Sequence, residues 1–214
     1  MKTVDSSHKD LQAIAKCHRS AFPESLSSKL GLSYCRKMLS FYLENERGIL
    51  FHMEGNDGVL GYCGGIRNRH PGQHGSATSM TQHTFRLLVI NLLFRPWLIF
   101  HHEILANFPL IIKNIKLRFN TANRSKSQTR VSPVKEFIPS MGLVVIGVSP
   151  KHQGKGYGSL LLKDFEERAS KEEFTRIHLS VNKNNSQAIA AYKKNGWLIG
   201  KEGHTELHMF KNLD

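Results

Sequence analysis

Three glycines in a basic turn give the strongest chemical signal in the sequence. Gly154, Gly156 and Gly158 follow the apolar run 143–148 and precede the amphipathic run 159–169, which predicts a strand, a tight loop and a helix. The first N–H groups of a helix have no intrahelical acceptor and lie at the positive end of its dipole. Glycines let that backbone approach a phosphate closely, so the turn is predicted to bind an anion.

The spacing of these glycines excludes two common phosphate-binding loops. A P-loop requires four residues between its first Gly and a Gly-Lys-Ser/Thr, and a dinucleotide fingerprint reads Gly-x-Gly-x-x-Gly, whereas this turn reads Gly-x-Gly-x-Gly. The segment from Val148-Ser149-Pro150 to Gly158 resembles instead the acyl-CoA pyrophosphate loop of the GCN5-related N-acetyltransferase (GNAT) superfamily, in which Gln/Arg-x-x-Gly-x-Gly/Ala follows Val-x-Pro.

A second segment resembles the same superfamily at the expected distance along the chain. Its pattern is Asn-x-x-Ala-x-x-x-Tyr-x-x-x-Gly-Phe, represented here by Asn185, Ala188, Tyr192, Gly196 and Trp197. The surrounding residues predict a helix over 188–194 that is capped by Ser186 and stopped by Gly196. Together the two motifs cover about residues 143–210.

The resemblance implies direct transfer of an acetyl group from acetyl-CoA to a primary amine in a ternary complex. It places Tyr192 near the thioester sulfur as the general acid, while Glu136, just before the fourth strand, is the first candidate for the base. His178 and Glu54 stay open as alternatives. The residues that it places against the cofactor are Ile146, Gly147, Val148, Gln153, Gly154, Lys155, Gly156, Tyr157, Gly158, Ser159 and Asn185.

Composition argues against disulfide-rich, metal-binding and secreted proteins. The three cysteines form no close pair, so we expect buried free thiols in the cytoplasm and no disulfide framework. The histidines show no metal-ligand spacing supported by a second pair, and no metal is expected. The N-terminal twenty residues lack an apolar segment of the signal-peptide kind.

The resemblance implies one α/β domain over 1–214 with the GNAT fold, and the remaining patterns agree with it. That fold is a mixed, mostly antiparallel sheet of six to seven strands flanked by helices. Helices are expected at 10–22 and 32–43, separated by a Ser-rich turn at 25–28. Strands at 49–53 and 59–65 should form a hairpin through Gly55-Asn56-Asp57-Gly58.

Residues 68–135 form an insertion between the third and fourth strands. It carries ten Lys and Arg residues against one acid, Glu103, within a net charge of +13. Three interpretations stay open: a wall of the substrate pocket, contact with a membrane surface or partner through 85–119, or extra core with a homodimer seam. Pro96 and Pro109 should break its helices, and its apolar runs are too short to cross a bilayer.

The basic charge alone does not indicate nucleic acid, because no recognised binding motif is present and the aromatic residues lie in apolar runs. The partners expected are acetyl-CoA and an amine acceptor of unknown identity. Two functional alternatives remain: a non-catalytic CoA-binding regulatory module, and a peripheral membrane acyltransferase whose insertion docks on lipid.

Overall fold

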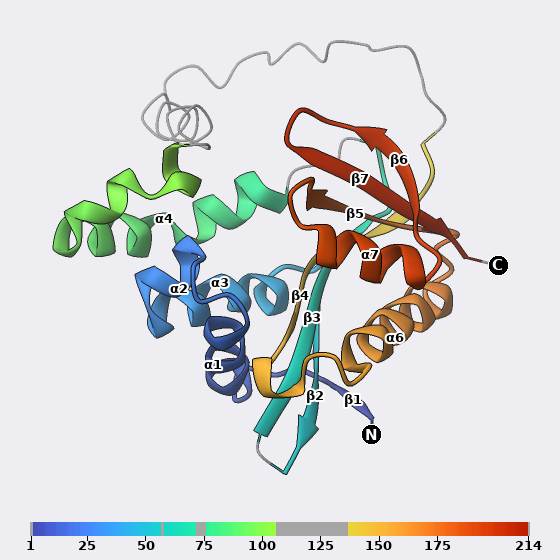
Figure 1. Ribbon diagram of the computed structural model, residues 1–214, viewed down its shortest axis with the longest axis horizontal. Coiled ribbons are helices and arrows are strands. Elements are labelled where there is room, and N and C mark those ends of the chain that lie inside the picture. The colour runs from blue at the N-terminus through green and yellow to red at the C-terminus, as the bar shows by residue number, and fades with distance from the viewer. Residues whose placement is uncertain (1, 57, 72–75, 106–136, 214) are drawn as a thin grey trace.

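A seven-stranded sheet lies at the centre of the computed structural model, which describes residues 2–56, 58–71, 76–105 and 137–213 (Figure 1). The strands are β1 (Thr3–Asp5), β2 (Gly48–Gly55), β3 (Gly58–Asn68), β4 (Ser140–Val148), β5 (Arg176–Asn182), β6 (Leu198–Glu202) and β7 (Glu206–Asn212). They are ordered β1-β2-β3-β4-β5-β7-β6. β4 and β5 pair in parallel and the other neighbours pair antiparallel, which confirms the predicted fold class.

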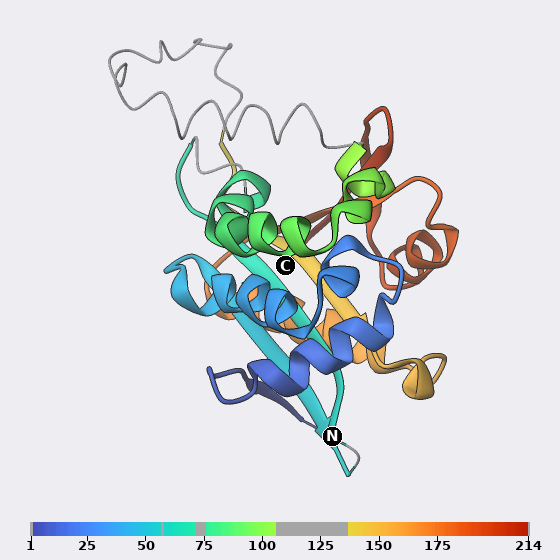
Figure 2. The same ribbon diagram turned by 90° about the vertical axis from the view of Figure 1, so that its left-hand side faces the viewer.

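Helices cover both faces of the sheet. They are α1 (Leu11–Ala21), α2 (Leu26–Leu30), α3 (Leu32–Glu44), α4 (Ser76–Phe94), α6 (Tyr157–Lys171) and α7 (Ser186–Lys194), with the 3-10 turns η1 (Pro96–Phe100) and η3 (Pro150–His152). The two views place α1 and α3 on one face and α6 on the other (Figures 1 and 2). The expectation of a plain turn at 25–28 was wrong, because Ser25 accepts a hydrogen bond from the Ser28 N–H and so caps the short helix α2.

The two helical layers enclose separate cores, and the alternation of side chains along the strands assigns residues to each. In β2, Ile49, Phe51 and Met53 point into the core beneath α6, whereas Leu50 points into the core beneath α1 and α3. This is the period of two that a strand with both faces buried requires. The hairpin expected between β2 and β3 is confirmed by the pairing of Gly55 with Gly58.

The described part of the insertion forms a second layer on α2 and α3 (Figure 2). Its inner residues Leu88 and Leu98 share a small core with Leu30 and Tyr34. α4 ends at Phe94, directly before Arg95-Pro96, as predicted. Pro109 lies outside the described residues. Among the helices of the described ranges, none is long and apolar enough to cross a bilayer.

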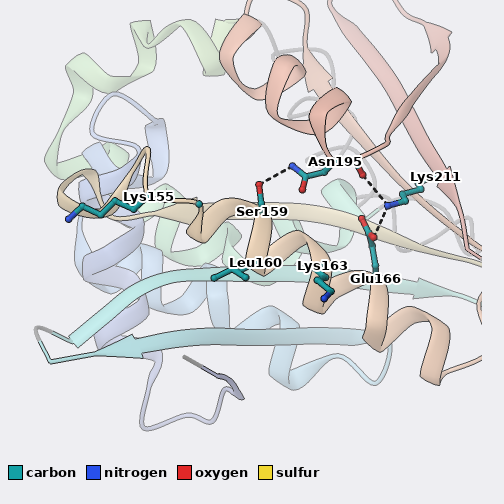
Figure 3. Close-up of a pocket in the computed structure, with 8 residues that line it drawn as sticks. Lys155, Ser159, Leu160, Lys163, Glu166, Asn195 and Lys211 are labelled. Atoms are coloured by element: carbon teal, nitrogen blue, oxygen red, sulfur yellow. Dashed lines mark hydrogen bonds and ion pairs between the residues drawn. The ribbon is translucent and has the colours of Figure 1, made fainter.

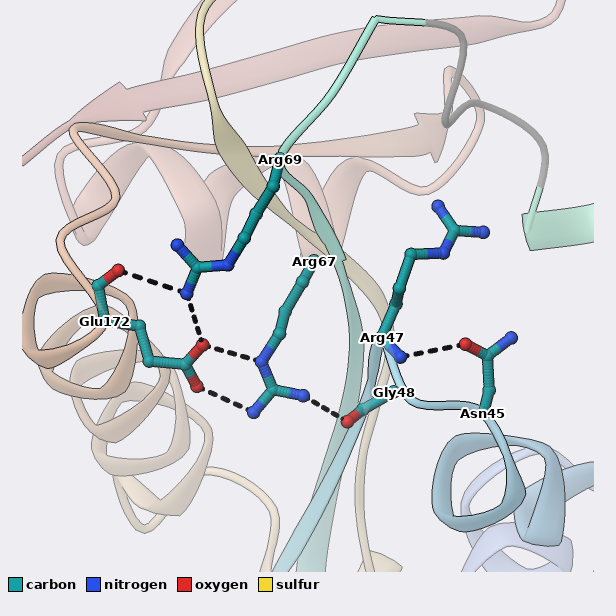
Figure 4. A network of polar contacts seen from close by, with 6 residues as sticks. All are labelled: Asn45, Arg47, Gly48, Arg67, Arg69 and Glu172. Atoms are coloured by element: carbon teal, nitrogen blue, oxygen red, sulfur yellow. Dashed lines mark hydrogen bonds and ion pairs between the residues drawn. The ribbon is translucent and has the colours of Figure 1, made fainter.

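An ion-pair network fixes the point where the insertion leaves the sheet (Figure 4). The carboxylate of Glu172, at the end of α6, accepts two hydrogen bonds of 2.6 Å from the Arg67 guanidinium and one of 3.1 Å from Arg69. Arg67 also donates to the Gly48 carbonyl. The last residues of β3 are therefore bound to α6 on one side and to β2 on the other.

Candidate functional site

The site begins where β4 and β5 separate. Their pairing runs from Met141–Ile177 to Leu143–Leu179 and stops there, although β4 continues to Val148. Val144 has no partner in β3, because Gly64 pairs with Val145 and Gly65 with Leu143. Such a bulge bends its strand and increases its twist. Beyond the bulge, β4 is no longer paired with β5. The backbone edge of β4 that faces β5 is therefore available to an extended ligand.

The turn after β4 is held by hydrogen bonds to the backbone of β3 and β4. The Ser149 N–H donates to the Leu60 carbonyl at 2.8 Å, and the Gln153 side-chain amide donates to the Val148 carbonyl at 3.0 Å. Gly154 and Gly156 have φ of +75° and +85°. A Cβ at either position would meet no atom within 4 Å. The left-handed backbone, not crowding by the protein, is therefore the reason for glycine.

The helix after this turn begins earlier than predicted. α6 starts at Tyr157 instead of Ser159, so Tyr157 and Gly158 form its first turn and do not belong to the loop. The left-handed Gly156 is the N-cap, because its carbonyl accepts the first helical bond, from the Leu160 N–H at 3.1 Å. Among the described residues, no N–H group of 154–159 donates to a backbone oxygen. Unpaired donors at the positive end of a helix dipole are the arrangement that an anion-binding turn requires.

A groove of about 570 Å³ continues from this turn along α6 (Figure 3). Its lining residues are Lys155, Gly156, Ser159, Leu160, Lys163, Glu166, Asn195 and Lys211. Asn195 donates to the Ser159 hydroxyl at 3.1 Å, and Lys211 donates to Glu166 at 2.8 Å and to the Asn195 carbonyl at 3.0 Å. Sequence reasoning found Lys155, Gly156 and Ser159. It missed the rest of the groove, because the later residues of α6, Asn195 at the end of α7 and Lys211 of β7 belong to no motif.

Tyr192 packs from α7 against the core beneath α6. It packs beside Trp197, with 5.8 Å between ring centroids. Burial raises the pKa of Tyr192 to about 12, with a smaller contribution from nearby Cys63. Because Cys63 pairs with Ile146 of β4, Tyr192 lies near the part of β4 that has left β5. Its hydroxyl is protonated at neutral pH and can act as a donor.

Asn185 precedes α7 and caps it. Its side-chain oxygen accepts a hydrogen bond of 3.1 Å from the Ala188 N–H. The expectation that Ser186 is the cap was wrong, since Ser186 is the first residue of the helix. The cap uses the amide oxygen of Asn185, and its NH₂ group takes no part in it. Gly196, at φ +82°, follows the helix as predicted.

The structure separates the candidates for the base. Glu136 lies outside the described residues. Glu54 bonds to His52 at 3.1 Å near the β2–β3 hairpin and is 61% exposed, so it belongs to a different part of the sheet. His178 lies over β4: a Cβ at Gly142 would be 2.9 Å from its Nε2. Gly142 and His178 form the pair next to Leu143–Leu179, the last pair before β4 and β5 separate.

A buried polar cluster behind β4 had no sequence signal. His18 is 5% exposed, with Nδ1 at 2.5 Å from the Tyr62 hydroxyl and Nε2 at 2.8 Å from the Ser27 hydroxyl. Burial lowers the pKa of His18 to about 4, so the imidazole is neutral. Tyr62 pairs with Gly147. The cluster thus supports β4 from the face opposite α6.

Possible ligand atoms for a metal also meet at the end of η1, from His101, His102 and Glu103, within 4.8 Å of one another. Hydrogen bonds account for the positions of two of the three, His101 and Glu103. His101 Nε2 contacts the Glu24 carbonyl at 3.1 Å, and Glu103 accepts from the Leu26 N–H at 3.0 Å. The cluster holds the insertion on α2 and gives no reason to assign a metal. The three cysteines are free and buried, as expected.

Comparison with known proteins agrees with this geometry. Residues 135–197 match the acetyltransferase (GNAT) family, while no curated protein matches the sequence. The fold is similar to that of a protein classed as a GNAT acetyltransferase from Desulfovibrio desulfuricans, at 9% identity and a TM-score of 0.59 over 100% of this chain and 99% of that one.

Two further solved structures have the same fold. One is the PaiA N-acetyltransferase of Thermoplasma acidophilum in complex with coenzyme A, at 13% identity and a TM-score of 0.55, covering 99% of each chain. The other is the ribosomal-protein-S18-alanine N-acetyltransferase of Escherichia coli, at 15% identity and a TM-score of 0.54, covering 100% of this chain and 94% of that one. The resemblance to the GNAT superfamily that the two motifs indicated is therefore confirmed, by the match over 135–197 and by the fold.

Proposed function

We propose that this protein is an N-acetyltransferase that moves the acetyl group of acetyl-CoA directly to a primary amine. One observation carries the proposal. Among the described residues, the N–H groups of 154–159 donate to no backbone oxygen, and they lie at the start of a 15-residue helix, after a strand that has left its neighbour. The family match and the fold support acetyl transfer in general.

The parts of acetyl-CoA fit different parts of this site. The pyrophosphate fits the amides of 154–159, where a backbone cradle and the helix dipole favour negative charge. The adenosine end, with its own phosphate, fits the groove that Lys155 and Lys163 line. The pantetheine arm, an extended chain of amides, fits the open edge of β4 at 146–148, with the Asn185 NH₂ group in reach of a carbonyl.

The proposed reaction forms a C–N bond and breaks a C–S bond. The neutral amine attacks the thioester carbon, and backbone N–H groups near Gly147 and Val148 stabilise the oxyanion. When the intermediate collapses, the CoA thiolate leaves and Tyr192 supplies its proton. The amine loses its proton to a base, for which Glu136 and His178 remain the candidates. The acceptor is not specified by these contacts.

Calorimetric titration with acetyl-CoA tests the binding site. Gly156→Glu places a carboxylate where the pyrophosphate should bind, and we expect it to abolish micromolar binding. Gly58→Glu is the matched control, because Gly58 also has a positive φ, +98°, with no atom within 4 Å of an added Cβ, but lies in the β2–β3 hairpin. Equal affinity in all three proteins would refute the site.

Thiol release during incubation with a panel of primary amines then tests the activity. Turnover that depends on both acetyl-CoA and an amine supports the enzyme. Tight binding without turnover on any amine would favour the alternative of a non-catalytic CoA-binding module.

A further inference from the structure

The outer face of the insertion exposes large apolar side chains that the described part of the chain does not cover. Five large side chains over 13 residues are more than half exposed. They define the outer patch: Leu93 (75%), Phe94 (80%), Trp97 (64%), Phe100 (78%) and Leu105 (57%). In Figure 2 this layer, α4 and η1, lies on the side facing the viewer. Apolar patches that are exposed together in this way mark interaction surfaces, whereas single exposed residues do not.

The inner face of the same segment packs on α2 and α3, so the outer patch is not the result of loose packing. Leu88 and Leu98 are buried against α2 and α3. Tyr34 and Thr84 join their hydroxyls at 3.2 Å, and the Arg95 guanidinium donates to the Lys29 carbonyl at 2.6 Å. These contacts hold α4 and η1 in place and present the outer patch on a fixed support. A helix that is apolar on both faces buries both of them.

Charge indicates what covers the outer patch. Within 76–105 the single acid is Glu103, and its carboxylate already accepts the Leu26 N–H. Arg86 of α4 is exposed. The same segment carries Arg86 and Arg95, and the net charge of the chain is +13. Exposed Trp, Phe and Leu beside an excess of cations are the composition of segments that lie in the interface of anionic bilayers.

We propose that the outer patch binds the surface of an anionic membrane, with Phe94, Trp97 and Phe100 entering the acyl boundary and Arg86 contacting lipid phosphates. This interaction is independent of acetyl transfer. It places the protein at a membrane while the cofactor groove, which α6, α7 and β7 line, belongs to a different part of the molecule.

The two tryptophans of the chain make the test direct. Trp97 is 64% exposed and Trp197 is 2% exposed, so a change in emission on adding vesicles reports Trp97, and Trp97→Phe leaves the buried residue as the reference. The intact protein is mixed with vesicles of phosphatidylcholine alone, or of phosphatidylcholine and phosphatidylglycerol at about 7:3, some carrying brominated acyl chains. We expect co-sedimentation with the anionic vesicles that weakens with salt, together with a blue shift and bromine quenching of Trp97.

Two variants separate the outer patch from general charge attraction. Phe94→Ser combined with Phe100→Ser should lower the partition coefficient by about tenfold or more, since each buried Phe contributes a large apolar area. Leu198→Ser, which changes a residue of the same 57% exposure as Leu105 but in β6, should leave it unchanged. Both variants change exposed side chains, so an unaltered unfolding temperature verifies the fold.

Several outcomes would overturn the proposal. These are no binding to anionic vesicles, binding without quenching of Trp97, or binding that the double Phe variant retains. Shielding of Trp97 from acrylamide in the free monomer would show that another part of this chain covers the outer patch. A dimer in light scattering that the double variant dissociates, without vesicle binding, would assign the outer patch to a second copy.

Discussion

Protonation of one buried histidine should make this protein unusually sensitive to mild acid. His18 is 5% exposed, and its two nitrogens face the hydroxyls of Tyr62 and Ser27. Burial lowers its pKa from 6.5 to about 4. In the unfolded chain the imidazole takes up its proton near pH 6.5, whereas in the folded chain it does so only near pH 4.

The sign and size of the effect follow from this difference. Between the two pKa values the unfolded state binds more protons, so the free energy of unfolding decreases as the pH falls. Above pH 6.5 the contribution of His18 is constant, and below pH 4 the loss is complete. A pKa that falls from 6.5 to about 4 corresponds to a total of about 3 kcal/mol. That is a substantial part of the 5–15 kcal/mol typical of a folded domain.

Urea unfolding at a series of pH values from 7.5 to 4.5, followed by circular dichroism, measures this loss in the native protein and in His18→Gln. The variant cannot titrate at this position, so we expect it to lose about 2 kcal/mol less across the series, whatever its stability at pH 7.5. Burial also lowers the pKa of His83, but that residue is present in both proteins and cancels in the comparison. Parallel pH profiles for the two proteins would refute the argument and mean that the His18 imidazolium is accommodated in the fold.

Three further changes test other parts of the structure. Tyr192→Phe should lower turnover by about 10²–10⁴-fold in thiol-release assays while leaving the dissociation constant for acetyl-CoA unchanged, and unchanged turnover would remove this phenol from the mechanism. Gly147→Ala should cost about 1–3 kcal/mol in urea unfolding, because the new Cβ would lie 2.8 Å from the Tyr62 ring; Gly158→Ala, whose Cβ would meet its nearest atom at 4.0 Å, should cost less. Glu172→Gln should lower stability at pH 7 by about 1 kcal/mol. The hydrogen bond from Arg67, with both arginine charges, lowers the pKa of this carboxyl, so the difference from the native protein should shrink as the pH falls below its ordinary value of 4.5.

Local patterns predicted most of the fold because they depend on neighbours in the chain. The glycines at 154, 156 and 158, the hairpin at 55–58 and the break at Pro96 are backbone requirements that a few consecutive residues express. The strand–turn–helix arrangement around these glycines follows from such patterns, and the fold class followed from the family resemblance that they carry. The errors were also local. Asn185 and Ser186 are both good caps, and the choice between them depends on which side-chain oxygen reaches the Ala188 N–H.

The tertiary structure decided the features that join distant parts of the chain. The groove combines Ser159 with Asn195 and Lys211, and the cluster behind β4 combines His18 with Tyr62. No spacing in the sequence relates these residues, because strand order and helix packing bring them together. The exposure of the outer patch is of the same kind. The sequence of the insertion by itself determined that 85–105 is apolar and flanked by cations, but only packing on α2 and α3 decided which side of it is buried and which is left facing outward.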